Sequence, residues 1–399
     1  METFDAMKRK VFYLTPFPPT RSGIADYAVC YKQAIEDYTD WHLEVVAQKE
    51  SIVGNSISDI LSIYHQVKQW QVDGAFNNVA IVHAEIGYTQ YREFYTLFWI
   101  QRLLPSLPYC ITVHDPPLVI APALYYLSFG LKARAIRYAC RTLDYTFLGK
   151  GLISSILSRA SCTFVLSDIG AKALNQLVGQ NTNIQTLPHI NYRSPLSRQR
   201  RLQTINEESI NILFMGFWHK TKGIELLLQT IKNVILNTQQ KVKLLMAGGL
   251  LQNNQNQKYV QSILNIIKHS PVRSAIEVLG YVQPNAVDAT FDRSDIFVLP
   301  YTQSPGYSSS GVLMRAMNAG LAIVATDFAP INEDIRHLET GLLVTPNDVN
   351  ALEKALIRLI NEPELRLKLG VQAQECACKE HSQERVAEIA SNIYTSISL

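Results

Sequence analysis

The chain has neither a long hydrophobic run nor a strong excess of charge of one sign. No segment reaches the length that an α-helix needs to cross a bilayer, and the net charge of +3 over 399 residues is too small to indicate a nucleic-acid partner. The first ten residues are polar and the apolar run after them is short, which is not the pattern of a secretory signal. We therefore expect a cytoplasmic protein that does not bind nucleic acid.

Two patterns typical of metal sites are also missing. The sequence has no Asp-x-Asp pair of the kind that holds a metal on a diphosphate, and its six cysteines show no metal-type pairing. We expect no metal site and no cofactor. Three of the cysteines, Cys30, Cys110 and Cys162, lie in apolar surroundings that favour packed, reduced thiols.

Short apolar runs that alternate with helical or irregular stretches dominate the chain. A content of 47% hydrophobic and 18% charged residues is typical of a globular protein, and 399 residues are too many for one ordinary core. The alternation predicts an α/β fold with two doubly wound parallel sheets in tandem. The predicted strands are residues 11–15, 43–47, 79–83, 109–113 and 162–166 in the first half, and 212–215, 243–247, 276–279, 296–299, 321–325 and 341–344 in the second.

A change in composition separates the two halves. Between residues 187 and 208 prolines, serines and arginines replace the periodic apolar pattern, which indicates a linker. We predict an N-terminal Rossmann-like domain over residues 1–195 and a C-terminal Rossmann-like domain over residues 205–379. A helix at about residues 380–399 is expected to complete the N-terminal domain.

The second half carries two loops suited to phosphate. In residues 300–320 a strand leads through Ser308, Ser309, Ser310 and Gly311 into a helix, whose first backbone N–H groups attract an anion and whose start a serine can cap. Residues 216–223 form a turn with Lys220 and Lys222 before another helix. A lysine at the start of a helix is unfavourable, because its positive charge opposes the helix dipole. An anion bound between the lysine and the helix would explain the lysine at this position. The alternatives are an ordinary capped turn and a solvated lysine.

Polar residues also follow the predicted strands of the first half. Gly23 comes after the first strand, His83 and Glu85 come at the end of the third, and His114 and Asp115 follow the fourth. Because ligands of doubly wound sheets bind beyond the carboxyl ends of the strands, these residues are candidates for a site. The alternative for each histidine is a structural role in the core.

Taken together, these motifs resemble the GT-B architecture of glycosyltransferase family 4, the retaining nucleotide-sugar transferases, across nearly the whole chain. Residues 17–27 resemble the glycine loop that touches the donor phosphates, and residues 111–115 the segment whose histidine reaches the donor sugar. Residues 214–223 are similar to the family's glycine–arginine…lysine–glycine loop, with Phe217 in place of the arginine. The remaining matches are residues 295–300, 316–320, 325–327 and 341–344 and Glu333.

The resemblance implies a role for each candidate residue. His114 orients the sugar and Asp115 fixes its loop, as the catalytic residues. The diphosphate is held by Gly23, Lys220, Lys222, Ser309, Ser310 and Gly311, and the donor sugar or nucleotide by Gly216, Glu333, Tyr307 and Arg315. Tyr307 and Arg315 stand where the family has two glutamates, so they either replace those sugar and ribose contacts or are surface and packing residues.

The function that the resemblance implies is metal-independent transfer of a hexosyl group from a UDP- or GDP-sugar, with retention of configuration. Residues 21–27 resemble members described as mannosyltransferases, which favours GDP-mannose. The alternatives are a binding protein of the same fold that has lost transfer, and an enzyme of altered chemistry.

The acceptor is expected to be a glycan, a lipid-linked molecule or a small molecule, bound by the first domain. Residues 129–159 hold six basic residues and a single acid, Asp144, among apolar ones. Such a segment either makes a peripheral contact with an anionic membrane at its inner face or holds an anionic acceptor such as a lipid phosphate. The alternative is an ordinary pair of helices packed on the sheet.

Overall fold

The computed structural model describes residues 9–20, 22–46, 57–87, 90–116, 134–143, 149–179, 182–192, 209–249, 256–304, 306–307 and 309–398. The chain forms two compact units. The N-terminal unit consists of Met1–Ile190 and Gln383–Leu399, and the C-terminal unit of Asn191–Ser382. Each unit has its own parallel sheet and its own hydrophobic core.

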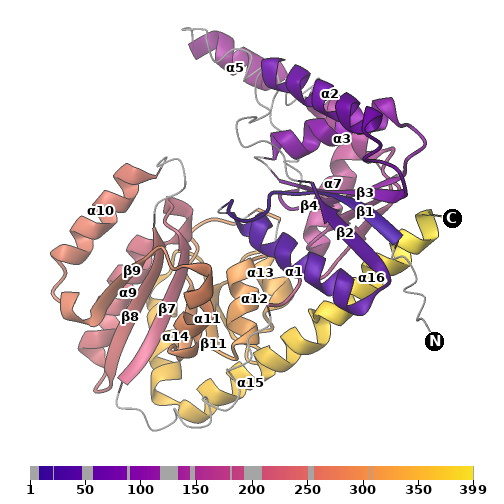
Figure 1. Ribbon diagram of the computed structural model, residues 1–399. Coiled ribbons are helices and arrows are strands. Elements are labelled where there is room, and N and C mark those ends of the chain that lie inside the picture. Colours follow the sequence, from indigo (N-terminus) through magenta and orange to yellow (C-terminus); the bar gives the residue numbers. More distant parts are fainter. Residues whose placement is uncertain are drawn as a thin grey trace, which may run out of the picture. The chain divides into compact units, whose positions relative to one another are not determined.

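The N-terminal unit is built on a six-stranded sheet in the order β2-β1-β3-β4-β5-β6 (Figure 1). From β1 the chain runs to β2 at one edge and then returns to β3 on the other side of β1, so the topological switch point lies between β1 and β3. The strands are β1 Arg9–Leu14, β2 Trp41–Val45, β3 Val79–Ile86, β4 Tyr109–Val113, β5 Cys162–Val165 and β6 Ile184–Thr186. The helices between them are α1 Gly23–Tyr38, α2 Ile57–Val72, α3 Tyr91–Leu103, α5 Arg134–Leu143, α6 Gly149–Leu157 and α7 Asp168–Val178.

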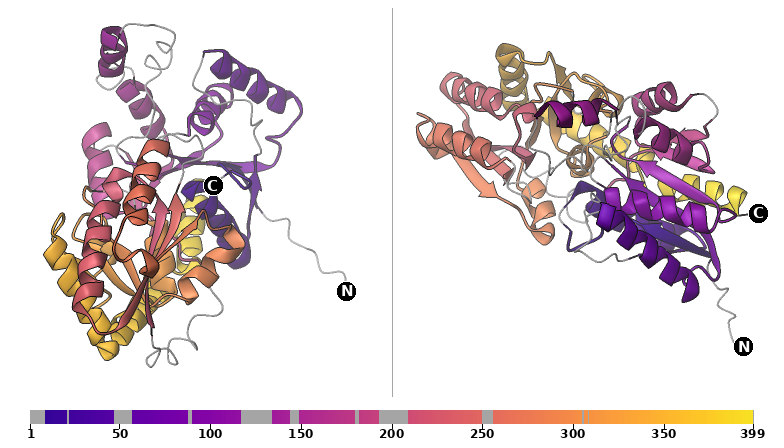
Figure 2. Two further views of the ribbon diagram at one scale, coloured as in Figure 1. Left: turned by 90° about the vertical axis from the view of Figure 1, so that its left-hand side faces the viewer. Right: turned by 90° about the horizontal axis from the view of Figure 1, so that it is seen from above.

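The last helix of the chain, α16 Gln383–Ile397, belongs to the N-terminal unit. It packs along α1, as Figure 2 shows for the yellow helix and the indigo one. Its apolar residues Val386, Ala387, Ala390 and Tyr394 are fully buried in the core on that side of the sheet. Burial of a whole face of α16 makes it an integral layer of the unit.

The C-terminal unit repeats the plan with the strand order β12-β11-β10-β7-β8-β9 (Figure 1). Here the switch point lies between β7 and β10. The strands are β7 Ser209–Phe217, β8 Lys241–Gly249, β9 Ile276–Gly280, β10 Ile296–Leu299, β11 Ala322–Thr326 and β12 Leu342–Val344. The helices are η4 Lys220–Lys222, α9 Ile224–Asn237, α10 Gln257–Lys268, η5 Arg273–Ala275, α11 Pro284–Asp292, α12 Gly311–Asn318, α13 Ile331–Asp334, α14 Val349–Asn361 and α15 Pro363–Glu380.

The predicted α/β class with two parallel sheets is confirmed, and several strand boundaries differ from the predicted ones. The short strand β6 was not predicted, because its three residues are only partly buried or exposed and give no apolar run. Strand β3 continues three residues beyond the predicted end, to Ile86. His83 and Glu85 therefore lie inside a strand and not in the loop that follows it.

Candidate functional site

The switch point of the C-terminal unit brings the two predicted phosphate loops together. Gly223, between η4 and α9, has φ +66, and a Cβ there would lie 1.7 Å from the carbonyl oxygen of Pro300. The two loops are also joined by hydrogen bonds, from the backbone N–H of Thr302 to the carbonyl of Thr221 at 3.0 Å and from the Thr302 hydroxyl to the carbonyl of Lys220 at 3.2 Å. The turn after β7 and the loop after β10 thus form one surface.

The lysines of this surface differ in their surroundings. Lys220 is exposed, whereas Lys222 is half-buried and its Nζ lies 3.9 Å from the centre of the Tyr301 ring, a cation–π distance. The strand before them is longer than predicted, since Gly216 and Phe217 still belong to β7. The Gly216 carbonyl lies so close to Gly248 that a Cβ on Gly248 would approach it to 1.8 Å.

The start of α12 lacks the side-chain cap that the sequence predicts. Ser310 is its N-cap residue, but the Ser310 side chain makes no capping hydrogen bond, so the expected serine cap is wrong at this position. Ser309 instead donates its hydroxyl to Asp334 Oδ2 at 2.7 Å. Ser308 lies outside the described residues. Gly311 is the first helical residue, and the first-turn N–H groups there have no partner inside the helix.

Three further predicted donor residues have different environments. Tyr307 has 36% of its surface exposed and Glu333, in α13, is exposed. Arg315 is engaged by its neighbours, because its Nη1 donates to Asp288 Oδ1 at 3.3 Å and its guanidinium carbon lies 3.8 Å from the centre of the Tyr192 ring. A role of Arg315 toward ribose or phosphate stays a prediction, and these contacts hold its side chain in one orientation.

At the switch point of the N-terminal unit, two loops and the first turn of α1 meet at Gly87. A Cβ on Gly87 would lie 2.7 Å from Asp115 Oδ2 and 2.8 Å from Ile24 Cδ1, so the loop after β3 touches both the loop after β4 and the first turn of α1. Gly23 opens that turn, and a Cβ there would meet no atom of the described residues within 4 Å. Ser22 caps the helix by accepting from the N–H of Ala25 at 3.0 Å.

His114 rests on a buried carboxylate. Its Nε2 lies 2.6 Å from Glu85 Oε2, and the hydroxyl of Tyr13 donates to Glu85 Oε1 at 2.7 Å. Tyr27 packs edge-on against the His114 ring with 5.0 Å between centroids. Glu85 is fully buried and His114 is 6% exposed, so this histidine is oriented by side chains from β1, β3 and α1.

His83 has no exposed surface and takes part in a second set of hydrogen bonds. Its Nε2 pairs with the Thr112 hydroxyl at 2.7 Å, and its Nδ1 pairs with the hydroxyl of Tyr394 on α16. The Tyr394 hydroxyl also lies 2.8 Å from that of Tyr31 on α1. Of the two open interpretations of His83, the buried structural role is the one its position favours.

Burial and pairing set the charge states in this core. Burial lowers the pKa of His83 to about 4, so the imidazole is neutral at pH 7. Burial alone would raise the pKa of Glu85, but the hydrogen bond and charge of His114, the charge of His83 and the hydrogen bond of Tyr13 outweigh it, so the pKa lies below its usual value. Glu85 is therefore an anion beneath His114.

The basic stretch at residues 129–159 lies partly outside the described residues. In α6, Ile153 and Ile156 are buried in the core of the unit, as expected for a helix packed on the sheet. On α5, Tyr138 and Leu143 are 76% and 48% exposed. No helix in the described ranges is long and apolar enough to cross a membrane, and contact of α5 with a membrane surface stays a prediction.

Comparison with known proteins identifies the second half of the chain. The family model described as glycosyl transferases group 1 matches residues 197–375, which include both phosphate loops and α12. Residues 197–375 are a group 1 glycosyltransferase domain. The match covers that part of the chain alone, and the two sheets with their flanking helices are those of the GT-B fold.

Solved structures and sequence relatives agree with this assignment. Sucrose-phosphate synthase from Thermosynechococcus elongatus superposes with a TM-score of 0.71 at 16% identity, over 97% of this chain and 98% of that chain. HepE of Anabaena in complex with UDP gives 0.67 at 14% identity, over 97% and 100%. At these identities the likeness concerns the fold.

Among sequence relatives, the N-acetyl-alpha-D-glucosaminyl L-malate synthase of Bacillus anthracis is 22% identical over 64% of this chain and 66% of its own length. The phosphatidyl-myo-inositol mannosyltransferase of Mycobacterium leprae is 27% identical over 84% of this chain and 78% of its own. The chain spans between 47% and 66% of the length of the first curated relatives that it matches.

Several residues that bear on the site were missed by sequence reasoning, among them Gly87, Asp334 and His381. Gly87 could have been found as a glycine directly after an apolar strand. Asp334 and His381 give no local signal, because their partners are distant in the chain: Asp334 accepts from Ser309, and its Oδ1 lies 3.9 Å from His381 Nε2.

Proposed function

We propose that the protein transfers a hexosyl group from a nucleoside-diphosphate sugar, a UDP- or GDP-sugar, to a glycan, lipid-linked or small-molecule acceptor, with retention of configuration and without a metal ion. The observation that carries the proposal is the junction at the switch point of the C-terminal unit, where Gly223 lies against Pro300 and sets Lys222 beside the loop that leads into α12. This junction offers the positive charge and the free N–H groups that a diphosphate needs.

In the proposed reaction the bond between the anomeric carbon and the diphosphate oxygen breaks, and a bond from that carbon to the acceptor oxygen forms on the same face. The departing phosphate oxygen takes the acceptor proton, so no separate carboxylate base is required. Lys222, Lys220 and the N–H groups at Gly311 stabilise the charge that develops on the leaving group. We propose His114 and Asp115 as the catalytic residues of the N-terminal unit, with Glu85 holding His114.

For the base of the donor nucleotide, we propose uracil or guanine on the basis of similar proteins. HepE was solved in complex with UDP, and the mycobacterial relative is named a phosphatidyl-myo-inositol mannosyltransferase. Uracil and guanine nucleotides are therefore the first to test. A lipid-linked acceptor would agree with a peripheral position of the exposed α5 on an anionic membrane, which sedimentation with anionic liposomes tests.

A second candidate, a binding protein of the same fold without transferase activity, rests on Tyr307 and Arg315. The two residues stand where the family has glutamates, and Arg315 is bound to Asp288 and Tyr192. A panel of UDP-, GDP- and ADP-sugars in a thermal-shift assay separates the candidates. A rise in Tm with one nucleotide sugar together with slow hydrolysis of that donor supports the enzyme, and binding without turnover supports the second candidate.

Lys222→Ala tests the diphosphate site directly. Removal of one donor to the leaving group should lower kcat by about 10²-fold, as loss of one oxyanion donor does. Lys241→Ala is the matched control, since Lys241 is an exposed lysine at the opposite, amino end of β8 and should leave kcat unchanged. Equal kcat values for the wild type and Lys222→Ala would exclude this lysine from the site.

A further inference from the structure

An acidic side chain lies directly behind the proposed diphosphate site. Asp334, at the end of α13, accepts the hydroxyl hydrogen of Ser309 at 2.7 Å, one residue before the N-cap of α12. A carboxylate at the start of a helix normally stabilises that helix through its dipole. At a start that is to hold a diphosphate, the same negative charge opposes the ligand.

Groups on three segments set the charge of Asp334. His381, just after α15, has its Nε2 3.9 Å from Asp334 Oδ1, and Glu333 and Glu380 are the nearby acids. The side chain of Asp334 is only 11% exposed. Burial raises the pKa of Asp334 to about 6, against the lowering effects of His381 and of the Ser309 hydrogen bond.

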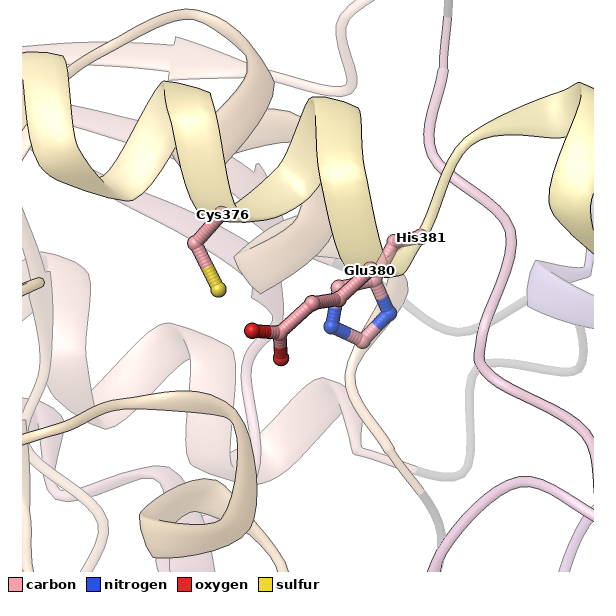
Figure 3. Close-up of side chains that lie close together, drawn as sticks. All are labelled: Cys376, Glu380 and His381. Atoms are coloured by element: carbon pink, nitrogen blue, oxygen red, sulfur yellow. The ribbon is translucent and has the colours of Figure 1, made fainter.

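Glu380 and Cys376, which lie beside His381, do not add an unpaired negative charge to this site. The ligand-type atoms of Cys376, Glu380 and His381 lie within 4.8 Å of one another (Figure 3). Arg336 donates to both Glu380 oxygens, at 2.6 Å and 2.8 Å. Burial raises the pKa of Cys376 to about 11, so it remains a neutral thiol. Since a guanidinium already neutralises Glu380, we assign no metal to this cluster, and Asp334 is the buried carboxyl that accepts from Ser309.

We propose that Asp334 makes donor binding depend on pH: the diphosphate binds preferentially when Asp334 is protonated, so that binding takes up a proton. The inference rests on the proposed function, because it requires a diphosphate at the start of α12. A second negative charge behind Ser309 favours the protonated carboxyl, so the bound ligand and the proton each strengthen the binding of the other. Affinity therefore falls as the pH rises through the range in which Asp334 ionises.

The test is the affinity for UDP-glucose and GDP-mannose measured between pH 5 and pH 8 by isothermal titration calorimetry. These diphosphate esters keep their charge over this range, whereas the terminal phosphate of a free nucleotide titrates near pH 6. We expect a Kd about tenfold higher at pH 8 than at pH 5, which corresponds to a pKa shift of about one unit on binding. Titrations in two buffers of different ionisation enthalpy should show an uptake of about half a proton near pH 6.5.

Asp334→Asn keeps the shape and the acceptor for Ser309 but removes the charge. We expect the Kd of this variant to lose the pH dependence that Asp334 causes. At pH 8 its Kd should be about tenfold lower than that of the wild type. Ser309→Ala keeps the carboxylate of Asp334, so the Kd of this variant should still depend on pH. His381→Gln removes the neighbour that lowers the pKa of Asp334 and should move the dependence to higher pH. His219→Gln controls for the exposed histidine of the η4 turn and should leave the difference between wild type and Asp334→Asn intact.

The outcomes distinguish the two proposals. Tight binding of a nucleotide sugar with no proton uptake, or with the same pH dependence in wild type and Asp334→Asn, overturns the role of Asp334 and leaves the proposed function standing. Absence of binding by either probe over the whole pH range overturns both.

Discussion

The two switch points solve the same problem of positioning by different means. In the N-terminal unit, His114 is oriented by buried side chains, with Glu85 and Tyr13 below it and Tyr27 beside it. In the C-terminal unit, the loops are positioned by backbone contacts, with Gly223 against Pro300 and Thr302 bonded to the η4 turn. The first arrangement fixes one side chain, and the second brings Lys222 and the start of α12 to adjoining loops.

This difference matches what each unit is proposed to do. A side chain that orients a sugar must hold one rotamer, and a hydrogen-bonded carboxylate beneath it provides that. A diphosphate has several oxygens and is best bound by many N–H groups brought close together, which requires glycine and small residues. The comparison therefore predicts that acid destabilises the N-terminal unit and that added side-chain volume destabilises the C-terminal unit.

The largest expected effect comes from a matched pair of glycines. Gly223→Ala places a Cβ 1.7 Å from the Pro300 carbonyl oxygen, so the two atoms overlap. The φ of +66 also strains the backbone of any residue with a side chain. We expect a loss of about 4 kcal/mol in the free energy of unfolding of the C-terminal unit. Gly23→Ala, at the corresponding turn of the N-terminal unit, should change stability by less than about 0.5 kcal/mol. Urea unfolding followed by hydrogen exchange in β7 and β3 measures both, and an equal loss for the two variants would contradict the comparison.

Acidification should affect the two units in opposite directions. The folded pKa of His83 is lowered to about 4 from 6.5, so the unfolded state binds more protons between these values, and this stability is full above pH 6.5 and is lost as the pH falls toward 4. The lowered pKa of Glu85 acts in the same direction at still lower pH. The loss for the N-terminal unit is about 3 kcal/mol, from the difference between the two pKa values.

Asp334 gives the opposite sign in the C-terminal unit. Its folded pKa is raised to about 6 from 3.8, so its contribution is full below pH 3.8 and is lost as the pH rises through 6, by about 3 kcal/mol. Hydrogen exchange at pH 7 and pH 4.5, corrected for the intrinsic rate, should show β3 opening more easily at the lower pH and α13 less easily. His83→Gln and Asp334→Asn should each abolish the change in its own unit only. A parallel change in both units would show that these two groups do not dominate.

The two switch points also differ in how well the sequence predicts them. The loops of the C-terminal unit were predictable because their signal is local: a buried strand, glycine, lysines and a helix start stand within a few residues of one another. The support beneath His114 was not, because Tyr13 comes from β1, Glu85 from β3 and His114 from the loop after β4. Nor was the loop serine predictable as a partner of Asp334, since only the packing of α13 beside the start of α12 brings the two together. Patterns of local spacing identify loops of this kind better than they identify side-chain networks.

The smallest expected effect comes from the hydroxyl of Tyr394, the residue through which α16 reaches the buried network. Tyr394→Phe removes the partner of His83 Nδ1 and of the Tyr31 hydroxyl while keeping the ring, which packs 5.4 Å from Trp41. Leaving two buried polar groups without this partner should cost about 2 kcal/mol in the stability of the N-terminal unit. Tryptophan fluorescence during urea unfolding reports the change through Trp41, and Ser396→Ala, on the exposed side of α16, is the control. If Tyr394→Phe is as stable as the control, α16 is held by its apolar face alone, and the network beneath the N-terminal site ends at His83.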